Sequence, residues 1–208
     1  MNTKSRILKR FVIYMAILTF VMFTVWAVVK SFMNRPPGDY ETEVCDIRLK
    51  DKLYAQALVA ANTALEKTKD HRGALMCKAL VFISQKKYTK ATEELDYLII
   101  FLEKNIENDD KTGTGTLAAA YANRGIIKDR IKNYQGALVD YIKALGIDHE
   151  AVAGPGLGTI ILNYKFKSSS VRDRALYLND QLQLPEDQRV LSIKELDEGQ
   201  VMHKPGKL

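Results

Sequence analysis

The stretch Ala118–Glu150, AAAYANRGIIKDRIKNYQGALVDYIKALGIDHE, decides the fold class because small and aromatic residues recur in it at fixed intervals. Two amphipathic helices joined by a tight turn need such a pattern. Gly125 and Ala137 let the two helices approach closely, and Tyr134 fills the turn between them. The stretch therefore predicts a helical hairpin, with landmarks at Tyr121, Gly125, Tyr134, Ala137, Tyr141 and Ala144.

Weaker copies of the same pattern precede this hairpin. Ala57 and Ala91 are 34 residues apart, and a tyrosine stands three residues before each of them, at Tyr54 and Tyr88. A constant step of this size is the signature of a repeated helical unit. The pattern therefore predicts two earlier hairpins, over residues 39–67 and 72–103.

The step to the third hairpin is longer. Ala91 and Ala137 are 46 residues apart, and the extra residues fall in the polar segment 107–116, which we expect to be a loop. One more step of 34 residues reaches Val171, in a degenerate fourth copy. Terminal copies of repeat arrays commonly degenerate in this way.

The period and the landmarks resemble those of the tetratricopeptide repeat, a family of stacked helical hairpins that repeat about every 34 residues. The resemblance covers residues 39–183 and is strongest in the third hairpin. It implies an all-α fold, in which an N-terminal transmembrane helix precedes a curved solenoid of three to four hairpins. It also implies a single-pass, membrane-anchored repeat protein of a bacterial envelope.

The predicted membrane span is residues 11–29, FVIYMAILTFVMFTVWAVV, which carry no charge. As a helix this segment measures roughly 28 Å, close to the ~30 Å hydrocarbon core of a bilayer. The alternative is a cleaved signal peptide, whose apolar region is about 7–15 residues long and ends at a small-x-small site. Trp26 and Lys30 stand where that site belongs, so the sequence favours a retained helix.

The net charge of +6 lies entirely in the N-terminal segment. Residues 1–38 hold six of the 31 basic residues and no acidic one, which leaves 25 basic against 25 acidic residues in the rest of the chain. This balance argues against a nucleic-acid partner. Four of the six precede the span, so the positive-inside rule places the N-terminus in the cytoplasm and the repeat domain in the periplasm, anchored in the inner membrane.

These features divide the chain into five segments. The last helix is expected to end before Pro185, a short capping helix can span residues 190–196, and residues 201–208 are expected to form a loose tail. The segments are a basic cytoplasmic segment (1–10), a transmembrane helix (11–29), a linker (30–38), a helical-repeat domain (39–184), and a C-terminal cap and tail (185–208).

The two cysteines, Cys45 and Cys77, fall on the first helices of neighbouring hairpins. In an exported domain a disulfide between them is conceivable. Small residues are needed at such positions, and free cysteine is commonly buried. The sequence therefore favours two buried free thiols and leaves the disulfide as the alternative.

The sequence contains no constellation of catalytic or metal-binding residues. His71, His149 and His203 are far apart and fall at hairpin junctions or in the tail, where solvated histidines are expected. The glycines of the segment 154–158 lack the strand and the Gly-Lys-Ser/Thr of a phosphate loop. We therefore expect no enzyme, no cofactor and no metal site.

The remaining candidate site is the concave face of the predicted solenoid, which in the resembled family holds an extended peptide or a partner helix. Asn123 matches the family position that bonds the backbone of a bound peptide. The alternative is that these apolar residues are ordinary core between helices. The predicted groove residues are Met76, Leu80, Ile83, Asn123, Ile126, Asp129 and Arg130.

The resulting hypothesis is a membrane-tethered scaffold for protein–protein interaction, acting as an assembly factor or chaperone-like adaptor. Its expected partners are membrane-bound or exported proteins. A permanent structural subunit of a membrane complex is the alternative, and an enzyme is the class with least support. The sequence names no specific partner, because scaffolds of this kind serve many pathways.

Overall fold

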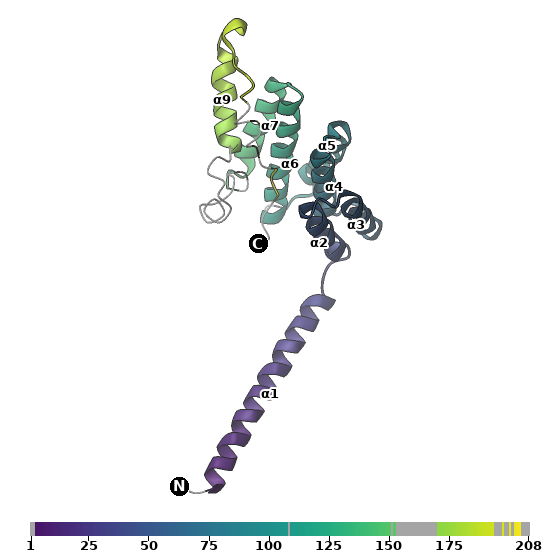
Figure 1. Cartoon of the computed structure of the whole chain (residues 1–208), viewed down its shortest axis with the longest axis vertical. Coiled ribbons are helices and arrows are strands. Elements are labelled where there is room, and N and C mark those ends of the chain that lie inside the picture. Colours follow the sequence, from purple (N-terminus) through teal and green to yellow (C-terminus); the bar gives the residue numbers. More distant parts are fainter. Residues whose placement is uncertain are drawn as a thin grey trace. The chain divides into compact units, whose positions relative to one another are not determined.

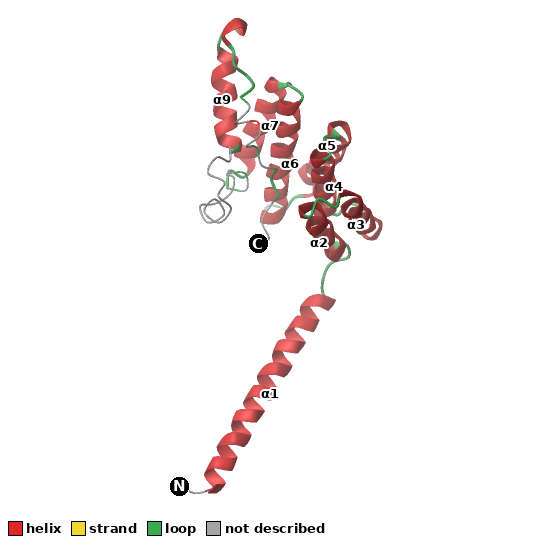
Figure 2. Cartoon of the chain, viewed as in Figure 1, coloured by secondary structure: helices red, strands yellow, loops and turns green. Residues whose placement is uncertain are grey.

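The computed structural model of the chain describes residues 3–107, 109–150, 152, 170–193, 197, 200 and 202–204. It divides into two compact units, Met1–Pro37 and Gly38–Leu208. Helices dominate both units (Figure 1), and the described residues include no β-strand (Figure 2). The predicted all-α class is confirmed for this part of the chain.

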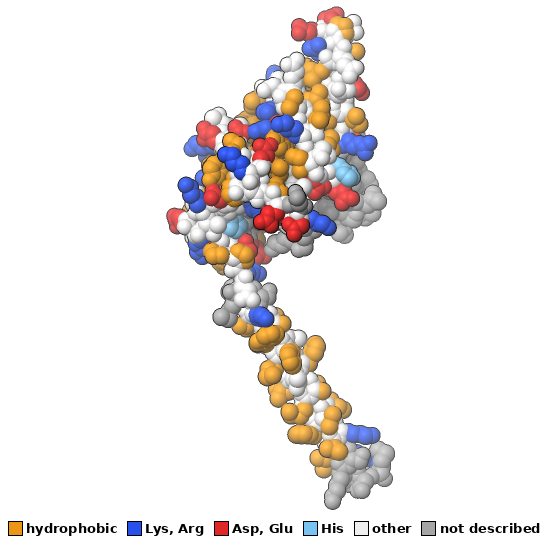
Figure 3. Space-filling model, turned by 180° about the vertical axis from the view of Figure 1, so that it is seen from behind, with side chains coloured by type: hydrophobic (Ala, Val, Ile, Leu, Met, Phe, Trp, Pro, Cys, Tyr) orange, Lys and Arg blue, Asp and Glu red, His pale blue; other side chains and the backbone are white. Residues whose placement is uncertain are grey.

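The first unit is one long helix, α1 (Thr3–Met33). Within it, Arg6–Lys30 is long and apolar enough to cross a membrane, and hydrophobic side chains are exposed along it (Figure 3). The helix continues past the predicted span, so the predicted linker of residues 30–38 is too long at its start. Nothing before Pro36 opposes helix, and only the residue preceding a proline is pushed toward extended backbone.

The described residues of the second unit form three successive helical hairpins and a further helix, α9. Within a hairpin the two helices pack together, and the first helix of the second hairpin, α4, also packs against α2 and α6. The helices are α2 (Asp39–Lys50), α3 (Tyr54–Lys67), α4 (Arg72–Ser84), α5 (Tyr88–Asn105), α6 (Lys111–Arg130), α7 (Tyr134–Ile147) and α9 (Val171–Gln183).

The polar segment 107–116 is only partly a loop, which corrects the sequence prediction. Helix α6 begins at Lys111, because the Asp110 side chain caps it by accepting a hydrogen bond from the Gly113 N–H at 2.7 Å. Asp110 also pairs with Arg72 at the start of α4. A Cβ at Gly113 would clash with the Asp110 carboxylate. The glycine that suggested a loop is therefore needed for the helix cap.

The turn inside each hairpin is the same in all three. Lys52, Lys86 and Lys132 adopt left-handed backbone, with φ of 61°, 58° and 66°. In the third, the Lys132 N–H donates to the Asp129 carbonyl and the Asn133 N–H to the Lys128 carbonyl. This pair of bonds is the Schellman ending of a helix. The landmark tyrosine then follows two residues after each lysine and opens the next helix.

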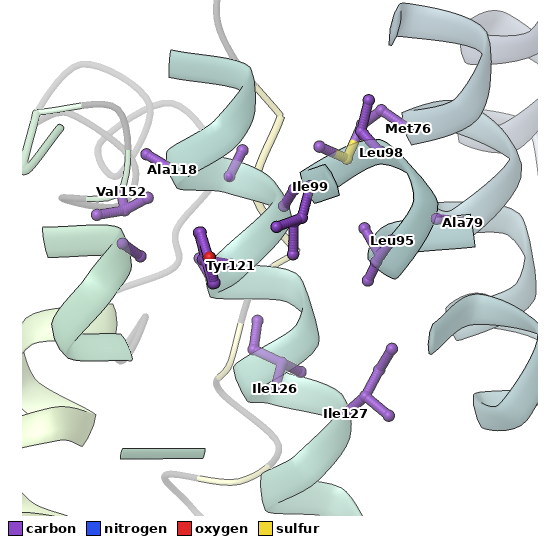
Figure 4. Close-up of a cluster of buried hydrophobic side chains, with 14 of the residues drawn as sticks. Met76, Ala79, Leu95, Leu98, Ile99, Ala118, Tyr121, Ile126, Ile127 and Val152 are labelled. Atoms are coloured by element: carbon purple, nitrogen blue, oxygen red, sulfur yellow. The ribbon is translucent and has the colours of Figure 1, made fainter. Parts of the chain in front are cut away.

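The core lies mainly between α4, α5 and α6 (Figure 4). Met76 and Ala79 contribute from α4, Leu95 from α5, and Ile126 and Ile127 from α6, all of them buried. Where α6 meets α7, a Cβ added to Gly125 would stand 2.6 Å from the Tyr141 ring. The predicted close approach of the two helices at Gly125 is confirmed.

Cys45 and Cys77 form a disulfide that joins α2 to α4. The prediction of two free thiols is therefore wrong, although both residues are fully buried as expected. The sequence predicted that both cysteines are buried because small residues are needed at these positions. A free cysteine and a disulfide-bonded cysteine both meet that need, so the pattern does not distinguish them. Pairing depends on the distance between the helices, and the two Cα atoms lie 6.4 Å apart.

The chain after α9 differs from the predicted cap. Helix α9 ends at Gln183, before Pro185 as expected, but Val190–Ile193 are not helical. The Val190 backbone is bonded to α9 instead, because its N–H donates to Gln181 and its carbonyl accepts from Tyr177. Leu196 lies outside the described residues, as do Ala151, Ala153–Ser169 and the first helix of the fourth predicted hairpin.

Because Gly125 lies so close to the Tyr141 ring, adding a single methyl group at residue 125 should measurably destabilise the fold. Gly125→Ala should lower the free energy of unfolding by about 1–3 kcal/mol, since overpacking a tight contact forces backbone shifts. Gly146→Ala is the matched control, because that position in α7 has no neighbour within 4 Å. It should be neutral or stabilising by up to ~1 kcal/mol. Equal effects of the two substitutions in urea unfolding would contradict the packing described.

The disulfide predicts that thiol alkylation of unreduced protein leaves Cys45 and Cys77 unmodified by mass spectrometry. Replacing both by alanine should cost about 3–4 kcal/mol by the loop-closure estimate for a sequence separation of 32. Cells quenched with acid before alkylation report whether the pair is oxidised in its own compartment. Two modified thiols in the unreduced sample would contradict the bridge.

Candidate functional site

The structure brings the predicted groove residues together between α4 and α6. Met76, Leu80 and Ile83 lie on α4, and Asn123, Ile126 and Asp129 lie on α6, which packs against it. All six are buried, and only Arg130 is exposed. An open groove is therefore not what the structure shows. Met76, Leu80, Ile83 and Ile126 belong to the hydrophobic core, which is the alternative that the sequence left open, and a further segment covers Asn123 and Asp129.

The cover is the chain's own C-terminal segment, of which Gln200 and Met202–Lys204 are described; we call these residues the docked tail. The Asn123 side chain holds it by two hydrogen bonds to one residue. Its Nδ2 donates to the His203 carbonyl at 2.6 Å, and its Oδ1 accepts from the His203 N–H at 2.8 Å. The Asn123 amide thus bonds the main chain of the docked tail and none of its side chains, and its Nδ2 also lies 3.5 Å from the Met76 sulfur on α4.

Further contacts from three residues fix the docked tail along its length. Gln200 Nε2 donates to the Asp129 carboxylate at 2.7 Å and lies 3.3 Å from the Tyr141 hydroxyl. The Ser84 hydroxyl lies 4.0 Å from the Met202 sulfur. Lys204 forms an ion pair with Asp46 on α2. The docked tail therefore touches α2, α4, α6 and α7.

A buried ion pair anchors the same region to α9. Arg174 is 1% exposed and donates from Nε and Nη2 to the two oxygens of Asp129, each at 2.7 Å. Its Nη2 also donates to the Leu191 carbonyl and lies 3.1 Å from Asp197. Removing one partner of such a pair leaves a buried charge, which is strongly destabilising. Asp129 is thus held by α9 and Gln200 rather than facing solvent.

Charge and burial set the protonation of the groups around the docked tail. Burial, followed by the neighbouring Asp129 carboxylate, raises the pKa of Tyr141 well above its usual value. Burial lowers the pKa of His203 from 6.5 to about 4. His203 lines a small hollow with Ile126, Tyr141 and Arg174. The His203 imidazole is therefore neutral near pH 7, as suits a site that already holds the Arg174 cation.

A cavity of about 580 Å³ opens beside the docked tail. Gln200 and Met202 form part of its wall, and Ile83 and Ser84 another part. Its polar lining is mostly basic and phenolic, with Asp129 and Asp197 as the acidic groups. The remaining lining residues are Tyr54, Lys86, Tyr88, Arg130, Lys132, Tyr134 and Ser192.

Two histidine predictions are corrected by the structure. His203 is 7% exposed in the docked tail, so that part of the predicted loose tail is packed. His71 is half-buried at the start of α4, where its Nδ1 accepts from the Ala74 N–H and its Nε2 pairs with Asp39 at 2.9 Å. His149 is exposed, as expected. Among the described residues, no group of three His, Cys, Asp or Glu could hold a metal ion.

Sequence reasoning missed the docked tail, Asp46 and Arg174. No periodicity marks residues 200–204, because an extended segment has none of the 3.6-residue spacing that identifies a helix face. The available signal was the apolar pair Val201-Met202 in an otherwise polar C-terminus. Asn123 was predicted only from the resemblance to the repeat family, and the structure places it against the docked tail.

The buried His203 predicts that the tail docks less tightly in acid. The docked form binds a proton only below pH ~4, whereas the released form binds one below ~6.5, so acid favours release. Between pH 7.5 and 5.5 the docking equilibrium should weaken about tenfold. NMR titration of the His203 imidazole in the full chain should give a pKa near 4, which rises toward 6.5 in Asn123→Ala. A value near 6.5 in the unmodified protein would contradict docking.

Comparison with known protein families finds no matching family, and a search of curated proteins finds no similar sequence.

Proposed function

We propose that this protein is a membrane-tethered scaffold whose face between α4 and α6 binds an extended segment of a partner protein. The observation that carries the proposal is the pair of hydrogen bonds between the Asn123 amide and the His203 main chain. Every extended peptide offers the same N–H and carbonyl. A site that bonds them is suited to peptide recognition in general.

The energetics of Asn123 support a binding role over a purely structural one. Its side chain is fully buried, and a buried amide without partners costs about 1–3 kcal/mol for each lost bond. An ordinary core position between two helices is filled more stably by an apolar residue. An asparagine placed where an extended backbone satisfies both ends of its amide is explained by recognition of that backbone.

The scaffold proposal extends to the repeat architecture. Three hairpins with the same turn, stacked through α2, α4 and α6, are what a tetratricopeptide-like array requires. In such an array the first helices of the hairpins line the concave face, and the docked tail contacts α2, α4 and α6. We propose that the array is of this kind.

The proposed location is the outer side of an inner membrane, with α1 as the anchor. The basic residues before the span favour a cytoplasmic N-terminus, and a disulfide persists in oxidising compartments. Anchoring confines the binding face to a thin layer above the bilayer, which raises its effective concentration toward membrane-bound and newly exported partners. The role proposed is that of an assembly factor or chaperone-like adaptor.

A second apolar surface favours the alternative of a permanent subunit. A hollow of about 450 Å³ on α2 and α3 is lined by Tyr40, Val44 and Val59 among others. Tyr40 is 53% exposed and Val59 67% exposed. A stable complex would cover such residues. A permanent subunit should co-purify stoichiometrically with its complex in mild detergent, whereas a transient adaptor should not.

The proposal predicts that Asn123→Ala abolishes partner capture. Tagged full-length protein, crosslinked in membranes and recovered by pull-down, should lose at least nine-tenths of its partner, because each lost main-chain bond weakens binding about fivefold or more. Asn179→Ala is the matched control, since Asn179 is exposed on α9. Helical circular dichroism should be the same for both variants. Undiminished capture by a folded Asn123→Ala variant would refute the proposed site.

A further inference from the structure

We infer that the partner segment competes with the protein's own tail and shares its chemistry: an extended strand with an amide side chain, then an apolar residue, then lysine or arginine. This inference rests on the proposed function and specifies the partner of the same site. It follows from what each described residue of the docked tail contacts.

The basic end of the segment is specified by Asp46. The Asp46 carboxylate, one quarter exposed, pairs with Lys204, the residue directly after the one bonded to Asn123. A partner with lysine or arginine at this point keeps the ion pair. A partner with a carboxylate there would place two negative charges together, which partial burial makes more unfavourable than it would be in water.

The other end favours an amide donor opposite Asp129 and, three residues earlier, an acidic group opposite Arg174. Gln200 donates to Asp129 and lies next to Tyr141, and Asp197 lies 3.1 Å from Arg174. Lys86, Arg130 and Lys132 line the adjoining cavity together with Asp129 and Asp197, so basic groups outnumber acidic ones there. The tail sequence, acidic at residue 197 and basic at 204, thus runs in the direction that the charges of this face favour.

The apolar middle and the cavity explain how a partner displaces a segment already in place. The tail is covalently attached, so its local concentration is high, of the order of millimolar for short flexible connections. It leaves about 580 Å³ unfilled beside Met202 and Ser84. A partner with a larger apolar side chain at that position buries surface that the tail leaves in contact with water, which gives it the advantage it needs.

The docked tail therefore keeps the site closed until a matching segment arrives. Closure also protects the buried Asn123 amide and the apolar residues around it from unspecific contacts. The tail covers the site but does not fill the cavity beside it. Its affinity for the site is therefore the affinity that a partner segment must exceed in order to displace it. Segments that lack the basic residue or the apolar residue bind too weakly to displace it.

The test uses the full chain in lipid nanodiscs and a fluorescent synthetic peptide of residues 197–208, DEGQVMHKPGKL. In the tail-release variant, Met202→Asp with His203→Pro, the donor to Asn123 is removed while the groove is unchanged. The peptide should bind this variant at least tenfold more tightly than the unmodified protein. A Lys204→Glu peptide should bind it at least fivefold more weakly. The control variant Val190→Asp, altered at an exposed residue, should match the unmodified protein.

Equal peptide affinity for the unmodified and tail-release proteins would overturn the inference, because the tail would then not compete. Absence of binding to a folded tail-release variant would overturn it as well. If in that case membrane capture still depends on Asn123, the groove takes a different segment and only this inference fails. If the peptide binds while capture is indifferent to Asn123→Ala, the proposed function fails and the tail–groove contact stands.

Discussion

The Asn123 side chain imposes the constraint on which the functional face depends. It is fully buried between α4 and α6, and both ends of its amide are satisfied by the main chain of one residue, His203. Buried amides in folded proteins almost always have partners. The His203 main chain meets this requirement here, and we propose that a partner segment meets it in the same way.

The hairpin turns, the disulfide and one buried ion pair hold the Asn123 face in place. Identical turns at Lys52, Lys86 and Lys132 fix how each hairpin closes. The disulfide joins α2 to α4. It therefore fixes the position of Asp46, the partner of Lys204, relative to the α4 residues beside Asn123. The Arg174–Asp129 ion pair joins α9 to α6. The docked tail is thus held against four helices whose positions are fixed independently of it.

Much of the helical core was predictable from spacing alone. Gly125 and Tyr141 meet as the hairpin pattern implied, and α9 begins at Val171, one period after Ala137. These succeed because helix packing imposes a 3.6-residue pattern and a fixed repeat on the sequence. The start of α6 was missed because Gly113 and Gly115 in a polar segment suggested a loop. In the structure Asp110 caps the helix, and both glycines are buried within it.

Only part of the candidate site's geometry was predictable. The predicted residues on α4 and α6 do lie together, but the prediction of an open groove was wrong because six of the seven are buried, and the prediction of a loose tail was wrong for residues 202–204. An extended segment that docks far from its sequence neighbours has no local signature; His203 is 80 residues from Asn123. The thiol pairing was missed for the same reason, since the sequence shows that two cysteines are small and buried but not how close their helices lie.

Amide hydrogen exchange of residues 200–204 in the full chain at neutral pH measures directly whether the tail occupies the Asn123 face. If the tail occupies the Asn123 face, the His203 amide should exchange at least tenfold more slowly than in the free peptide, as a hydrogen-bonded, buried N–H does. The same amide should exchange at the free-peptide rate in Asn123→Ala. Exchange at the free-peptide rate in the unmodified protein would show that the tail does not cover the Asn123 face, and would contradict the docking of His203 on Asn123.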